Sequence, residues 1–120
     1  MLNALDYAYI GDAVYELYIR KHLISSGITN VGDLTKSSLE YVSAKSQRKH
    51  LERLMNTNFL VEDELDKIKY GRNTKGTKSK SADIVTYRMA TGLECLIGYL
   101  HLSNQDIRVN EIMEFIVKGE

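Results

Sequence analysis

Hydrophobic side chains recur along this chain with the period of an amphipathic helix, and polar segments separate the repeats. Residues 3–25 have apolar stripes on two sides. One stripe contains Ile10, Ala13, Val14, Leu17 and Ile24, and the other contains Leu5, Ala8, Ile19 and Leu23 with Asp12 in its middle. A helix that is apolar on two sides is buried between layers or lies in an oligomer interface. Gly27 is expected to end this helix, because glycine readily adopts the left-handed conformation found there.

The remaining pattern predicts further helices. They comprise a short turn from Thr29 or Asn30 to Thr35, then helices from Ser37 to Asn56, Val61 to Gly71, Ala82 to Leu102, and after Ser103 or Asn104. The run Ser37-Ser38-Leu39-Glu40 matches a capping box, which marks a helix start. Predicted core positions are Leu39, Val42, Leu51, Leu54, Met55, Leu65, Ile68, Ala90, Leu93, Ile97, Leu100, Ile107, Val109, Ile112, Met113 and Ile116.

The composition favours one all-α domain over residues 1–120, since the hydrophobic fraction is 43% and proline is absent. The single cysteine, Cys95, excludes an intramolecular disulfide framework and favours a cytoplasmic location. No apolar run approaches the ~18 residues that span a bilayer, so we expect no membrane association.

Charge is balanced overall but segregated along the chain. There are 16 basic and 16 acidic residues, which excludes an argument for nucleic acid from net charge alone. Basic side chains gather in two places, and they are Lys67, Lys69, Arg72, Lys75, Lys78 and Lys80 in one run and Lys45, Arg48, Lys49 and Arg53 in the other. Such segregation lets a neutral protein hold a polyanion on one face, although a solvated charged surface is the alternative.

Two acids stand beside glycines in predicted helices. Asp12 follows Gly11, and Glu94 lies between Gly92 and Gly98. A helical glycine costs about 1 kcal/mol relative to alanine, and its use is close backbone approach. Close approach of the two helices would let both acids share a Mg²⁺ ion, which prefers oxygen ligands. The alternative is that each acid forms an ion pair at the surface, and spacing alone leaves both interpretations open.

Three motifs then indicate a family. Tyr9-Ile10-Gly11-Asp12-Ala13-Val14-Tyr15-Glu16 resembles the signature box of the ribonuclease III catalytic domain. Asp33-Leu34-Thr35-Lys36 is similar to that family's acidic-Leu-Thr segment, and Glu94-Cys95-Leu96-Ile97-Gly98 is similar to its second acidic box. The motifs occur in the family's order over nearly the whole chain. The segments that begin at Gly71 and Ile97, and the absence of a double-stranded-RNA-binding domain, resemble the short bacterial class called Mini-ribonuclease III.

The resemblance implies an all-helical, two-fold homodimer that cleaves double-stranded RNA with Mg²⁺ and leaves a 5′-phosphate and a 3′-hydroxyl. It implies maturation of the ends of 23S (large-subunit) ribosomal RNA precursors, and it leaves open whether a ribosomal protein assists. Asp12 and Glu94 correspond to catalytic metal ligands. Glu16 and Thr91 are expected beside these ligands, with a polar network as the alternative role for Glu16.

Two departures from the larger family reduce the number of carboxylates. Ala8 and Leu5 replace glutamates before Asp12, and Thr91 replaces an aspartate before Glu94. Whether one or two ions bind is therefore open. A non-catalytic RNA-binding or ribosome-assembly module on the same fold is the rival interpretation. Double-stranded RNA is recognised through phosphates and 2′-hydroxyls, and the residues expected to contact it are Lys45, Gln47, Arg48, Arg72, Asn73, Lys75, Lys78 and Lys80.

Overall fold

The computed structural model describes residues 2–74 and 83–118, and these residues form helices without any strand. The helices are α1 (Ala4–Ser25), α2 (Val31–Val42), α3 (Ala44–Asn56), α4 (Glu62–Arg72), α5 (Ile84–Leu102) and α6 (Asp106–Lys118). The all-α prediction is confirmed for this part of the chain. Within it, no helix combines the length and apolar character needed to cross a bilayer.

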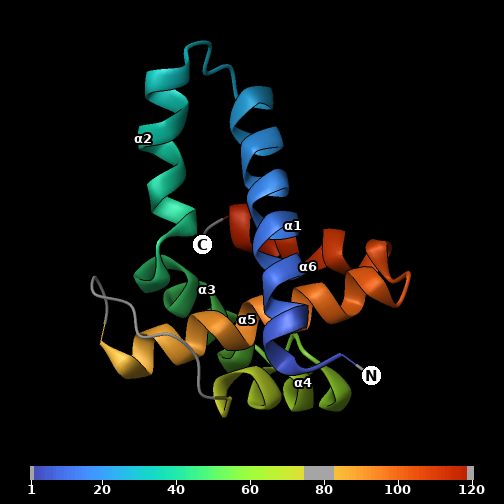
Figure 1. The fold of residues 1–120 in the computed structure, drawn as a ribbon. Coiled ribbons are helices and arrows are strands. Elements are labelled where there is room, and N and C mark those ends of the chain that lie inside the picture. Colours follow the sequence, from blue (N-terminus) through green and yellow to red (C-terminus); the bar gives the residue numbers. More distant parts are fainter. Residues whose placement is uncertain (1, 75–82, 119–120) are drawn as a thin grey trace.

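Helix α5 is the centre of the fold, since α1, α3, α4 and α6 all pack against it (Figure 1). The predicted α5 face is confirmed, because Ala90, Leu93, Ile97 and Leu100 are all buried. Helices α1 and α2 lie side by side and extend away from the other helices (Figure 1). Their lower ends therefore meet the core, while their upper ends are surrounded by solvent.

Helix α1 begins and ends almost where the sequence predicts. Asn3 and Asp6 form a capping box, in which each side chain accepts a hydrogen bond from the other residue's backbone N–H at 3.0–3.1 Å. Gly27 has a φ of 98°, the left-handed conformation expected just beyond the helix end. Local capping signals were therefore sufficient to define this helix.

Burial along α1 only partly follows the two predicted stripes. Ala8, Ile19 and Leu23 are buried as expected, but Leu17 and Ile24 are 56% and 61% exposed. Asp12 is exposed rather than buried within its stripe. Leu17 and Ile24 belong to the stripe opposite the one that packs on α5, and this side of α1 is uncovered in the single chain.

The predicted helix from Ser37 to Asn56 is wrong, because two helices meet at Ser43. Ser43 has extended backbone, with a ψ of 152°, and its hydroxyl accepts a hydrogen bond from the Ser46 N–H at 3.2 Å. Ser37 lies inside α2 instead of starting a helix. The true N-cap of α3 is therefore Ser43, while Asn30 caps α2 through the backbone N–H of Asp33.

Three predicted core positions are also wrong. Leu39, Met55 and Ile107 are 58%, 39% and 82% exposed, because no neighbouring helix covers their sides of α2, α3 and α6 in the single chain. The other core positions are buried or packed against the core. Asn104 does not cap α6 but has a left-handed φ of 59°, and α6 begins at Asp106.

An ion pair between α4 and α6 stabilises the base of the fold. Arg108 donates two hydrogen bonds to the Glu64 carboxylate, at 2.7 and 2.8 Å, and a third to the Phe59 carbonyl oxygen at 2.7 Å. The Glu64 side chain is only 4% exposed. Burial raises the pKa of Glu64, but the Arg108 hydrogen bonds and the Val61 N–H hold it below its ordinary value. The pair is therefore charged and fully bonded.

Candidate functional site

The site is built on a crossing of α1 and α5 in which glycine backbones touch. A Cβ added to Gly11 would overlap the Glu94 carbonyl oxygen, and one added to Gly98 would overlap the Tyr7 carbonyl oxygen. Only glycine permits two helix backbones to approach this closely. The crossing therefore fixes the positions of two acids. Asp12 follows Gly11 on α1, and Glu94 lies one helical turn before Gly98 on α5.

The Asp12 and Glu94 carboxyl groups lie within hydrogen-bond reach of each other. Burial, then the Asp12 hydrogen bond and charge, and to a smaller extent the Glu16 charge, raise the pKa of Glu94 to about 8. Two carboxylates this close resist being ionised together unless a cation joins them. The pair is thus arranged to hold either a proton or a metal ion.

Neither acid is neutralised by a basic side chain. The ion pairs among residues 2–74 and 83–118 join other acids, and none of them includes Asp12 or Glu94. Glu16 is paired with Arg20 at 3.2 Å and is 39% exposed at its side chain. Of the two interpretations left open above, the surface ion pair is therefore excluded for this part of the chain.

A divalent ion fits this pair as a site with few protein ligands. The described residues contain no group of three or more acidic, histidine or cysteine side chains that could hold a metal. Mg²⁺ keeps several waters and is commonly bound by one or two carboxylates together with substrate phosphates. Two adjacent carboxyl groups without a cationic partner match this requirement.

The residues expected beside the acid pair differ in their placement. Glu16 is near enough for its charge to raise the pKa of Glu94. Thr91 is buried, and its hydroxyl donates to the Tyr87 carbonyl oxygen at 3.0 Å within its own helix. The Thr91 hydroxyl is therefore bonded to the backbone of its own helix.

The prediction that Gln47 contacts RNA is wrong. Its side chain is 2% exposed, so it is not available to an RNA phosphate. Its Nε2 instead donates to Oε2 of Glu94 at 3.3 Å, and this hydrogen bond acts to lower the pKa of Glu94. One signal for this burial was present in the sequence, because Gln47 lies one and two helical turns before Leu51 and Leu54 on the same apolar stripe.

Tyr15 is a second buried neighbour that the sequence analysis did not assign to the site. It is fully buried, and its hydroxyl donates to the Tyr41 carbonyl oxygen at 2.6 Å. Burial and then the negative charge of Glu94 raise its pKa far above the ordinary value, so the hydroxyl stays protonated. Tyr15 is therefore a neutral side chain, held by its hydrogen bond to Tyr41, that is close enough to Glu94 to respond to its charge.

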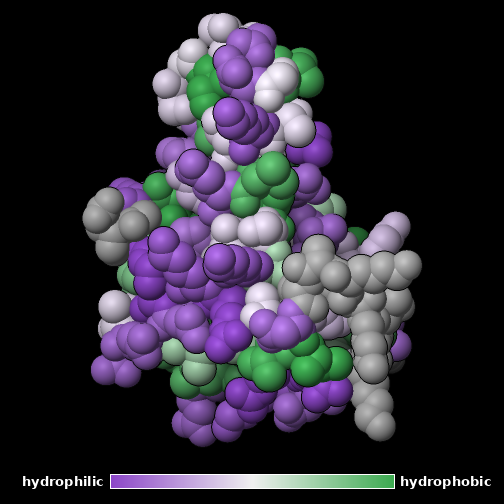
Figure 2. Space-filling view, turned by 90° about the vertical axis from the view of Figure 1, so that its left-hand side faces the viewer, coloured by the Kyte–Doolittle hydropathy of each residue, from purple (hydrophilic) through white to green (hydrophobic). Residues whose placement is uncertain are grey.

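The other predicted RNA contacts lie near the junction of α3, α4 and α5. Lys45 and Asn73 are exposed, and Arg72 is partly exposed. Arg48 is held in place, since its Nη1 donates to Thr86 Oγ1 at 2.9 Å. Lys75, Lys78 and Lys80 fall outside the described residues. Figure 2 shows hydrophilic side chains gathered across the middle of the face that includes the N-terminal end of α5.

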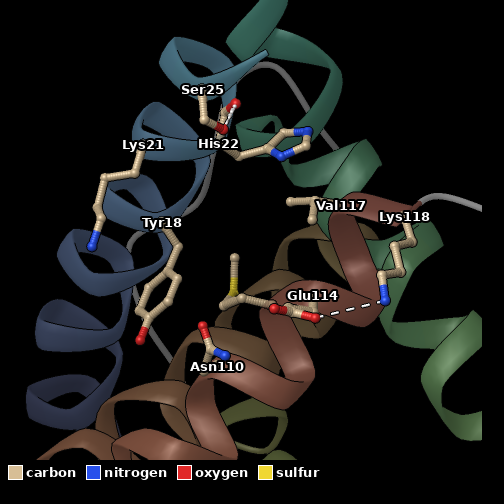
Figure 3. Close-up of a pocket in the computed structure, with 9 residues that line it drawn as sticks. Tyr18, Lys21, His22, Ser25, Asn110, Glu114, Val117 and Lys118 are labelled. Atoms are coloured by element: carbon tan, nitrogen blue, oxygen red, sulfur yellow. Dashed lines mark hydrogen bonds and ion pairs between the residues drawn. The ribbon is translucent and has the colours of Figure 1, made fainter.

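A hollow of about 470 Å³ between α1 and α6 is separate from this site. Its walls are Tyr18, Lys21, His22 and Ser25 of α1 and Asn110, Met113, Glu114, Val117 and Lys118 of α6 (Figure 3). Lys118 forms an ion pair with Glu114 at 3.6 Å in its wall. Neither Asp12 nor Glu94 is among these residues, so the acid pair lies outside the hollow.

The sequence and the fold of this chain match a known family. The Ribonuclease III domain family matches residues 5–105. The chain therefore belongs to the ribonuclease III family and is an endoribonuclease of that type, as the three sequence motifs predicted.

The chain is also similar to individual proteins and to a solved structure. Two proteins named Mini-ribonuclease 3, from Enterococcus faecalis and Brevibacillus brevis, are 45% and 46% identical to this chain. The alignments cover 98% and 100% of this chain and 89% and 91% of the relatives. A crystal structure of protein FN1578 from Fusobacterium nucleatum aligns with a TM-score of 0.88 at 31% identity, covering 98% of this chain and 94% of that one.

Proposed function

We propose that this chain is a Mg²⁺-dependent endoribonuclease that cleaves double-stranded RNA through Asp12 and Glu94. The observation that supports the proposal most directly is the contact between these two carboxyl groups without a basic partner. Membership of the ribonuclease III family supports the same substrate class. A module that only binds RNA has no need of an acid pair whose mutual repulsion costs stability in the absence of metal.

Asp12 and Glu94 would hold the ion through carboxylate oxygens, with Glu94 in its ionised form. When bound, Mg²⁺ supplies activation of a water nucleophile and polarisation of the scissile phosphate. Water adds to phosphorus, the bond from phosphorus to the 3′ oxygen breaks, and the 3′ oxygen takes up a proton. The products carry a 5′-phosphate and a 3′-hydroxyl. Glu16, with its ion pair to Arg20, adds negative charge beside the site.

RNA contact is proposed for the basic surface near the N-terminal end of α5. Lys45, Arg48, Arg72 and Asn73 contribute exposed or partly exposed side chains there, and Lys75, Lys78 and Lys80 follow Asn73 in the sequence. Lysines and arginines suit a duplex that is recognised through its phosphates rather than its base edges. Gln47 is not part of this surface.

A homodimer is proposed through the uncovered side of α1. Four large apolar side chains are exposed there: Leu5, Tyr9 and Leu17 of α1, at 38%, 80% and 56%, and Leu2 just before α1, at 43%. Exposed apolar patches of this kind mark interaction sites. A two-fold axis along this side would place one acid pair on each strand of an RNA duplex, so that one binding event cuts both strands.

The substrate is proposed to be a precursor of large-subunit ribosomal RNA, processed in the cytoplasm by a single domain over residues 1–120. The similarity to proteins named Mini-ribonuclease 3 supports this assignment. A ribosomal protein bound to the RNA is proposed as a substrate partner.

Cleavage assays test the proposed activity. Wild-type protein should cut a generic RNA duplex and a precursor ribosomal RNA duplex in Mg²⁺ but not in EDTA. Asp12→Asn should reduce the cleavage rate by at least about 10³-fold, because the remaining carboxylate cannot hold the ion in place. RNA binding in Ca²⁺ should be retained, which controls for folding. Near-normal cleavage by Asp12→Asn would refute the proposed site.

A further inference from the structure

Gln47 is held deep in the fold with its amide directed at a proposed metal ligand. It lies in the first turn of α3, where its backbone N–H donates to the Ser43 carbonyl oxygen at 2.9 Å. Helix α3 packs directly against α5. The 2% exposed side chain crosses this contact, and Nε2 reaches Oε2 of Glu94 at 3.3 Å. Both the backbone and the side chain of Gln47 are therefore fixed.

A buried amide needs a reason, because removing it from water is costly unless it is hydrogen-bonded. Here the partner is Glu94, whose other charged neighbours, Asp12 and Glu16, are both acids. In the described part of the chain, Gln47 provides the side-chain N–H donated to the Glu94 carboxyl group. An amide can give this hydrogen bond without adding a positive charge, whereas a lysine or arginine would compete with a bound cation.

We propose that Gln47 is a positioning residue that fixes the Glu94 carboxylate in the orientation required to bind a divalent cation together with Asp12. The amide donates its hydrogen bond to Oε2, and this bond would restrict rotation of the carboxylate that holds the ion. This inference rests on the proposed function. Hydrogen-bond partners of metal-binding carboxylates typically change metal affinity or activity by about 10- to 100-fold when they are removed.

The test compares two variants on the buried face of the same helix, α3. Gln47→Met keeps the side-chain length and removes the N–H donor. Leu51→Met is the matched control, since Leu51 is fully buried one turn later on α3 and packs in the apolar core. Mn²⁺ binding to the RNA-free protein is measured by electron paramagnetic resonance, with thermal unfolding in EDTA as the measure of folding.

Gln47→Met should bind Mn²⁺ about 10- to 100-fold more weakly than wild-type protein, while Leu51→Met should bind it as wild type does. Raising the Mn²⁺ concentration should restore RNA cleavage by Gln47→Met but not by Asp12→Asn. Wild-type Mn²⁺ affinity in a folded Gln47→Met would overturn the positioning role and leave the metal site itself intact. If the wild-type protein bound no Mn²⁺, the proposed function and this inference would both fail.

A measurement on unaltered protein covers the case in which Gln47→Met does not fold. The side-chain amide of Gln47 gives its own ¹⁵N–¹H signals. They should shift on titration with Mg²⁺, because the ion would replace the proton on Glu94, the acceptor of this amide's hydrogen bond. The exposed amide of Gln105 serves as the control and should not shift. Signals of Gln47 that stay unchanged at saturating Mg²⁺ would overturn the proposal.

Discussion

Glu94→Gln should change how the stability of the metal-free protein depends on pH. The wild-type carboxyl group has a pKa of about 8 in the folded protein and an ordinary value of 4.5 when unfolded. Between these values the folded state holds a proton that the unfolded chain has released, so unfolding loses a proton. Protonation of Glu94 therefore contributes stability to the folded state that is complete below about pH 4.5. This contribution is lost as the pH rises through about 8. Glutamine stays neutral throughout and can still accept the Gln47 hydrogen bond.

The size of this effect follows from the change in proton affinity. A pKa carried from 4.5 to about 8 corresponds to about 5 kcal/mol, at about 1.4 kcal/mol for each tenfold change. Water reaches Asp12, which is exposed, so screening reduces the repulsion, and we expect a measured change of at least about 2 kcal/mol. Mg²⁺ should reverse the trend in wild-type protein, because it binds the ionised form and the folded state only.

Urea unfolding in EDTA at intervals from pH 5 to pH 9 measures the effect as a difference between wild type and Glu94→Gln. Other groups cancel in this difference. His50, for example, has its pKa lowered by burial and by Arg53, so its contribution is lost as pH falls below 6.5, equally in both proteins. The wild-type free energy of unfolding should fall relative to that of Glu94→Gln as pH rises. Parallel curves for the two proteins would refute the close approach of Asp12 and Glu94.

Three further outcomes are expected. Gly98→Ala places a Cβ against the backbone of α1 and should lower the free energy of unfolding by at least about 2 kcal/mol. The control, Gly32→Ala, is at an open helical position and should raise it by about 0.5–1 kcal/mol. Equal stabilities of the two variants in urea would contradict the helix crossing. Arg108→Met leaves the buried Glu64 carboxylate unpaired and should cost about 3–5 kcal/mol by thermal or urea unfolding at pH 7, whereas a loss under 1 kcal/mol would mean that the pair is dispensable. Tyr9→Asp should raise the dissociation constant of the homodimer by about 30-fold or more in light scattering after gel filtration, and an unchanged dimer would exclude this side of α1 as the interface.

The sequence was sufficient for features that are encoded within a few turns of the chain. Asn3, Asp6 and Gly27 define the ends of α1 through local hydrogen bonds and backbone conformation. The apolar repeat of α5 predicts its buried face. Glycines beside Asp12 and Glu94 marked the two acids as unusual, because a helical glycine without a packing role is a cost that sequences rarely keep.

The tertiary structure alone decided which of these positions are covered and what they touch. Leu39 and Ile107 follow a helical apolar repeat as well as buried residues do, yet no element covers them in the single chain. Gln47 looked like a member of a basic, solvent-facing helix, but the packing of α3 on α5 buries it against Glu94. Periodicity gives the direction of a side chain around its own helix axis and says nothing about which distant helix lies there.

In the candidate site, too, the sequence determines which residues are present and the tertiary structure determines how they interact. The sequence determined that a carboxylate would stand at Asp12 and another at Glu94, each beside a glycine able to admit a close neighbour. Their contact, the raised pKa of Glu94 and the amide support from Gln47 join residues from three helices that are far apart in the chain. Electrostatic and hydrogen-bond energies depend on distances of a few ångströms and on exclusion of water, and both are set only when α1, α3 and α5 are packed together.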